Sequence, residues 1–208
     1  MIAELVGSLI ASAYGFCTFF RKKMPLFYKI TFYAALTCMI GNVYTVLYEL
    51  LWQPAADGFH IGYLGYMGMF FFLYSSYYGA LDSLADGKQP ELRRFRIAAG
   101  IAAAIFFTGS ALLMHFGNQA FWMYVVVIPM SFTMYFAVNH LIIPDVEMGI
   151  IEVMRPYNAL IIGLCVCMML RIISVPGSMF ETVSSVCTGV LLAIYLPAAR
   201  NGVRKWFI

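Results

Sequence analysis

Apolar segments of roughly membrane-spanning length recur along the chain, and short polar connections separate them. An α-helix needs about 20 apolar residues to cross a hydrocarbon layer of about 30 Å. The nearly uncharged stretch 97–143 is too long for one crossing, so we expect it to turn at the polar residues 117–119. The pattern therefore predicts seven transmembrane helices, at about residues 2–20, 27–52, 60–82, 97–116, 120–143, 157–175 and 179–199.

The composition agrees with this pattern. Hydrophobic residues make up 62% of the chain and charged residues only 11%, whereas about a quarter of the residues in a soluble domain are charged. The predicted fold class is therefore all-α: a polytopic membrane protein whose residues 1–208 form one seven-helix transmembrane domain. We expect a multi-pass protein of a cell membrane, either a plasma membrane or a bacterial inner membrane, with the lipid bilayer as a partner.

Basic residues are unevenly distributed among the connections. With seven spans, twelve of the thirteen Lys and Arg residues fall on one side of the membrane, and only Arg171 lies on the other. The twelve are Arg21, Lys22, Lys23, Lys29, Lys88, Arg93, Arg94, Arg96, Arg155, Arg200, Arg204 and Lys205. Because cytoplasmic connections carry the excess of Lys and Arg, this distribution predicts an N-terminus outside the cell and a C-terminus in the cytoplasm.

Polar residues in three spans recur at a helical spacing of 100° per residue, which places them on one face of each helix. They are Cys38, Asn42, Thr45 and Glu49; then Glu181, Ser184, Thr188 and Tyr195; and, less tightly, Tyr124, Ser131, Tyr135 and Asn139. Since hydrocarbon penalises polar groups, we expect these faces to point into the bundle. They either form hydrogen bonds between helices or line a water-filled cavity.

The span 60–82 carries an aromatic stripe on one helical face. Its members are Tyr63, Tyr66, Phe70, Tyr74 and Tyr77. Such a stripe either packs in the core or lines a ligand site. Gly68 and Gly79 beside it are expected to let a neighbouring helix approach closely. The remaining face is expected to contact lipid, through Met69, Phe72, Leu73 and Ala80.

Arg171 is the one base on the predicted outer side, where most of the neighbouring charges are acidic. A lone arginine near a membrane is expected to have a carboxylate partner, and Glu181 and Glu49 are the candidates. This outer mouth, which also contains His60 and His115, is either a vestibule that binds a solute or senses protons, or a thin hydrated rim.

Asp82 falls at the predicted cytoplasmic boundary, just before a basic connection. We expect it to pair with bases of that connection, the candidates being Lys88, Arg93, Arg94 and Arg96. The pair is either an ordinary boundary ion pair or a latch that opens when the protein is activated.

The chain lacks the residue patterns of several membrane proteins that carry out chemistry. The span 179–199 contains no lysine that could hold retinal. The three histidines are split between the two sides, so no metal site and no cofactor are predicted. No nucleophile or metalloprotease motif occurs, so no catalytic residue is predicted, and the sequence does not favour an enzyme.

The sequence is typical of a receptor-like or sensory membrane module. We expect it to bind a small molecule or lipid in the outer half of the bundle and to signal to a cytoplasmic protein. The predicted ligand-binding residues are Asn42, Glu49, Tyr63, Tyr66, Arg171 and Glu181, with Asp82 as the candidate latch. The alternative is a small-solute transporter or the substrate-binding membrane component of one. No nucleic-acid partner is expected.

Overall fold

The computed structural model describes residues 2–20, 24–51, 61–82, 89–116, 122–144, 149–175 and 177–207, and these residues are almost entirely helical. The long helices are α1 (Ile2–Phe19), α2 (Leu26–Leu51), α3 (Gly62–Ser76), α5 (Arg93–Phe116), α6 (Trp122–Ile142), α7 (Ile150–Ile173) and α8 (Met179–Phe207). A π-helical turn, η1 (Tyr77–Leu81), continues α3, and a 3-10 turn, η2 (Pro90–Leu92), precedes α5. The all-α prediction is confirmed for this part of the chain. The turn predicted at 117–119 lies outside the described residues.

Six of these helices are long and apolar enough to cross a membrane, namely α1, α2, α5 with η2, α6, α7 and α8. The α-helical part of α3 falls short, because it gives way to the π-helical turn after Ser76. Side-chain burial agrees with a bilayer environment: large apolar side chains such as Ile105 (68% exposed) face outward, while Glu4, Asn42 and Asn158 are buried. A soluble protein would show the reverse.

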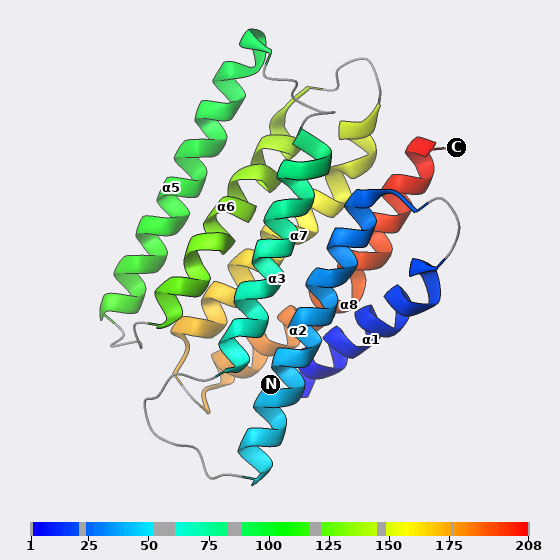
Figure 1. Cartoon of the computed structure of the whole chain (residues 1–208). Coiled ribbons are helices and arrows are strands. Elements are labelled where there is room, and N and C mark those ends of the chain that lie inside the picture. The colour runs from blue at the N-terminus through cyan, green and yellow to red at the C-terminus, as the bar shows by residue number, and fades with distance from the viewer. Residues whose placement is uncertain are drawn as a thin grey trace.

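Six helices form a closed ring (Figure 1). α1 packs against α2 and α8, α8 packs against α7, α7 against α6, α6 against α3, and α3 against α2. α5 lies outside the ring and contacts mainly α6, and few of its side chains are buried. The interior of the ring is therefore made by α1, α2, α3, α6, α7 and α8.

The chain termini lie at opposite ends of the bundle (Figure 1). We call the end where α1 begins the N-terminal end. The other is the basic end, since α5 and α7 begin there and α8 ends there with their arginines, including Arg93, Arg155 and Arg204.

Two pairs of glycines allow helices to touch backbone to backbone. A Cβ atom built on Gly65 of α3 would lie 2.5 Å from Gly41 Cα and 2.9 Å from Thr37 O, both backbone atoms of α2. Gly7 of α1 and Gly189 of α8 meet in the same way. By contrast, Gly68 and Gly79 are not the points of closest approach that the sequence suggested. A Cβ on Gly68 would lie at an ordinary van der Waals distance, 3.4 Å, from Thr37 Cβ, and a Cβ on Gly79 would meet no atom within 4 Å.

Helix boundaries extend beyond the apolar segments at the basic end. α7 begins at Ile150 instead of near residue 157, and α8 continues through the basic residues 200–207. Hydropathy locates only the part of a helix that suits hydrocarbon, whereas backbone hydrogen bonding continues into polar residues. Gly149, with φ of 67°, sets the start of α7 because this left-handed conformation favours glycine.

The lipid-facing side predicted for the span 60–82 is wrong for two of its residues. Met69 and Leu73 are fully buried, because α3 lies between α2 and α6 and has neighbours on two sides. The large apolar side chains that are exposed in this span are instead Ile61, Leu64, Phe71 and Tyr78.

Candidate functional site

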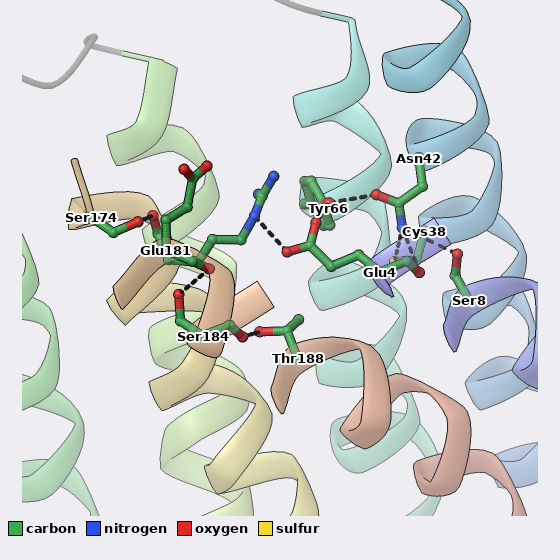
Figure 2. A network of polar contacts seen from close by, with 10 residues as sticks. Glu4, Ser8, Cys38, Asn42, Tyr66, Ser174, Glu181, Ser184 and Thr188 are labelled. Atoms are coloured by element: carbon green, nitrogen blue, oxygen red, sulfur yellow. Dashed lines mark hydrogen bonds and ion pairs between the residues drawn. The ribbon is translucent and has the colours of Figure 1, made fainter. Parts of the chain in front are cut away.

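A cluster of polar side chains is buried near the N-terminal end of the ring (Figure 2). We call it the ion-pair cluster, and its members are Glu4 and Ser8 of α1, Cys38 and Asn42 of α2, Tyr66 of α3 and Arg171 of α7. Hydrogen bonds and one ion pair thus join α1, α2, α3 and α7 within parts of these helices that are otherwise mainly apolar.

The ion pair joins Glu4 and Arg171. Arg171 Nε lies 2.5 Å from Glu4 Oε1, and the exposed fractions of the two side chains are 15% and 0%. The N–H of that nitrogen is not aligned with the carboxylate, so the contact is electrostatic in character. The guanidinium also lies 5.8 Å from the centre of the Tyr66 ring, within the range of a cation–π interaction. A charge buried this deeply is stable only if it is paired.

Tyr66 and Asn42 complete the surroundings of the carboxylate. The Tyr66 hydroxyl lies 2.9 Å from Glu4 Oε2 and 2.5 Å from Asn42 Oδ1, and its single proton is donated to one of them at a time. The Asn42 amide donates to Ser8 Oγ at 3.1 Å and to the Glu4 backbone oxygen at 3.3 Å. Tyr66 of α3 thus contacts the Glu4 carboxylate directly, and Asn42 of α2 contacts the Tyr66 hydroxyl in turn.

The glycine contacts bring these side chains together. Gly41 precedes Asn42, and Gly65 precedes Tyr66, so the closest approach of α2 and α3 lies beside the cluster. On the other side, a Cβ on Gly189 would lie 3.2 Å from the Glu4 backbone nitrogen. Small residues at both contacts let α1 sit deep enough to bury its glutamate.

Three of the six predicted ligand-binding residues therefore lie together: Asn42, Tyr66 and Arg171. The expected partner of Arg171 was wrong, because Glu4 pairs with it instead of Glu181 or Glu49. The sequence places Glu4 among the acidic residues of the outer mouth, but Glu4 was not chosen as a candidate partner of Arg171. Its spacing of four residues from Ser8 was the available signal, since it places both on one helical face.

The other three predicted residues lie around this cluster. Tyr63 is half-buried one turn from Tyr66 and interacts electrostatically with Arg171. Glu49 is exposed on α2. The Glu181 carboxylate accepts a hydrogen bond from the Gly177 N–H at 2.7 Å, at the start of α8, as in a helix cap.

Glu49 and Glu181 line a pocket at the N-terminal end. This N-terminal pocket has a volume of about 630 Å³ and lies between the start of α1, the end of α2 and the start of α8. Ala3, next to Glu4, forms part of its wall. Glu181 also interacts electrostatically with Arg171. The pocket therefore lies beside the ion-pair cluster.

A second polar contact crosses the ring nearer the basic end. The Tyr77 hydroxyl, in the π-helical turn, donates to Asn158 Oδ1 of α7 at 2.8 Å. Both side chains are fully buried, and Phe27 and Tyr157 pack edge-on or tilted against Tyr77. This contact fixes η1 to α7 across the ring interior.

Asp82 is not paired with the arginines that follow it at the start of α5. Its carboxylate Oδ1 lies 3.5 Å from His140 Nε2 of α6, and no described arginine is within ion-pair distance. Lys88, another expected partner, lies outside the described residues. His140 is fully buried against the Tyr77 ring, whereas 22% of the Asp82 side chain is exposed.

We predict unequal effects for the two partners of this contact. Asp82→Asn is expected to lower the free energy of unfolding by no more than about 1 kcal/mol, since one polar contact of a partly exposed carboxylate contributes little to stability. His140→Ala is expected to lower it by about 2–5 kcal/mol, because it removes a buried ring. Reversible unfolding in detergent micelles measures both. Equal losses would mean that the contact between Asp82 and His140, and not the packing of the His140 ring, joins η1 to α6.

The described residues include no group of three or more His, Cys, Asp or Glu side chains that could hold a metal ion. No protein-family model, curated protein or solved structure matches the chain. The interpretation of the ion-pair cluster therefore rests on its own geometry.

Proposed function

We propose that the chain is a sensory membrane module that binds a small molecule in the N-terminal half of the ring and passes the signal to a cytoplasmic partner. In this proposal, α3 with η1 is a seventh transmembrane helix, the N-terminus is outside the cell, and the basic end faces the cytoplasm. The distribution of Lys and Arg supports that orientation.

The observation that carries the proposal is the buried Glu4–Arg171 pair. Taking two charges out of water costs several kcal/mol, and apolar residues of similar size often give equal or greater stability. Ionisable residues within transmembrane segments are for this reason functional candidates by default. The pair lies beside an open pocket, where an acidic, basic or zwitterionic solute would meet a charge of the opposite sign.

The hydrogen bonds of the cluster offer a route for the signal. A solute that draws Arg171 away from Glu4 changes the contacts of α7 with α1 and α3 at once. Nearer the basic end, α7 meets η1, the continuation of α3, through the hydrogen bond between Tyr77 and Asn158. A small shift of α7 relative to α3 would therefore reach the cytoplasmic connections.

A transporter is the second candidate, and one observation favours it. Pockets open at both ends of the bundle, one beside the ion-pair cluster and one beside η1. A solute path between them would pass the buried Tyr77–Asn158 contact.

Three labelled solutes test the proposal: acetate, methylamine and glycine, which carry a carboxylate, an amine or both. We expect at least one to raise the melting temperature of the purified wild-type protein. It should not stabilise the double variant Glu4→Gln with Arg171→Met, which removes both charges together. We expect no uptake of these solutes into vesicles containing the protein. Uptake would favour the transporter, and a stabilisation that persists in the double variant would contradict this binding site.

A further inference from the structure

A second pocket opens at the basic end, where four elements of the ring meet. It has a volume of about 230 Å³ and lies between the start of α2, the turn η1, the start of α7 and the end of α8. Its lining is almost entirely apolar and includes Phe27, Ala80, Leu81, Met154 and Val203. We call it the basic-end pocket.

The π-helical turn shapes this pocket. Three successive residues of η1, Gly79, Ala80 and Leu81, all line it. In a regular α-helix three successive side chains are 100° apart and spread over more than half of the circumference. π-helical turns occur frequently at functional sites. A Cβ on Gly79 would meet no atom within 4 Å, so the space beside this glycine is empty.

The size and chemistry of the pocket suit one kind of occupant. Pockets for compact drug-sized ligands measure roughly 300–1,000 Å³ and contain a few placed polar groups. The basic-end pocket is smaller and apolar, which suits a segment of a flexible hydrocarbon chain. It lies where the apolar part of the bundle gives way to charged residues, so a lipid whose acyl chain fills it would have its headgroup near those charges.

The charges next to the pocket favour an anionic headgroup. Arg155 follows Met154 and Arg204 follows Val203, and both arginines are exposed. Each basic residue near a membrane surface attracts anionic lipid with about 1 kcal/mol. Among the residues that the structure describes, no acidic side chain lines the pocket.

We propose that the basic-end pocket binds one acyl chain of an anionic phospholipid, whose phosphate lies against Arg155 and Arg204. This inference does not depend on the proposed sensory function. The bound chain would contact Phe27, whose ring packs against Tyr77 and Tyr157. The lipid would thereby stabilise the contact between η1 and α7.

A substitution whose side chain fills the basic-end pocket tests the proposal. Native mass spectrometry of the purified full chain would compare the retention of phosphatidylglycerol and phosphatidylcholine with identical acyl chains. We expect wild type to retain one phosphatidylglycerol more strongly than phosphatidylcholine. Gly79→Leu should weaken that retention by at least roughly tenfold, because its side chain occupies the pocket. Gly109→Leu is the matched control, since a Cβ on this α5 glycine also meets no atom within 4 Å.

The arginines provide a second test that leaves the pocket lining unchanged. The double variant Arg155→Gln with Arg204→Gln should lose the preference for phosphatidylglycerol and keep its retention of phosphatidylcholine. Two results would overturn the proposal. One is wild-type protein that retains both lipids equally, and the other is Gly79→Leu protein that retains phosphatidylglycerol as wild type does.

Discussion

Arg171→Met is expected to lower the free energy of unfolding by about 3–5 kcal/mol, because it leaves a buried carboxylate without a counter-charge. The Glu4 side chain is completely buried, and the other contact of its carboxylate among the described residues is with the neutral Tyr66 hydroxyl. Reversible unfolding of the purified protein in detergent micelles measures the loss. Arg93→Met is the matched control, since Arg93 is exposed at the start of α5.

The control separates the ion pair from the general effect of losing a positive charge. Arg93→Met should change the free energy of unfolding by no more than about 0.5 kcal/mol, as is usual for surface substitutions. Similar losses for both variants would mean that Arg171 is not the counter-ion that Glu4 needs.

Gly65→Ala is expected to lower the free energy of unfolding by about 2–3 kcal/mol, which is large for the addition of one methyl group. The new Cβ would lie 2.5 Å from Gly41 Cα and 2.9 Å from Thr37 O, and backbone atoms cannot move aside as flexible side chains do. α2 and α3 must then separate next to Asn42 and Tyr66, so the ion-pair cluster is disturbed as well.

The same substitution at Gly109 of α5 should have the opposite sign. A Cβ there meets no atom within 4 Å, and alanine is favoured over glycine in a helix by up to about 1 kcal/mol. Unfolding of both variants under identical conditions gives the comparison. A Gly65→Ala protein as stable as Gly109→Ala would show that α2 and α3 are not in backbone contact at this point.

The sequence was informative about which faces of the helices are buried. Asn42 was selected from a polar helical face, Tyr66 from an aromatic face and Arg171 as the one base on the predicted outer side, and all three lie in one cluster. Helical spacing also placed Ser184, Thr188 and Tyr195 inward, as their burial confirms. Periodicity succeeds here because it depends only on the geometry of a single helix.

Pairing between helices could not be predicted in the same way. Nothing in the spacing along one helix states which other helix it contacts, so Arg171 was assigned to the wrong glutamates. Gly68 and Gly79 were singled out as points of close approach, whereas Gly65 is the one that touches α2. Each of these choices depends on the order of helices around the ring.

The π-helical turn also could not be predicted from the sequence. Tyr77–Leu81 has the apolar and aromatic character of the helix before it, and no proline marks the change of helix type. Asp82, at the end of this turn, was expected to pair with the bases that follow it, whereas its carboxylate lies beside His140 of α6. The pocket beside Gly79 depends on the backbone, which the side-chain pattern does not encode.

A double-mutant cycle between Glu4 and Arg171 tests the central claim most directly. It compares the free energy of unfolding of wild type, Glu4→Gln, Arg171→Met and the double variant. If the two charges are paired inside the ring, the double variant should be more stable than the sum of the single losses implies, by at least about 2 kcal/mol. Losses that add to within about 0.5 kcal/mol would contradict the pair and the site built on it.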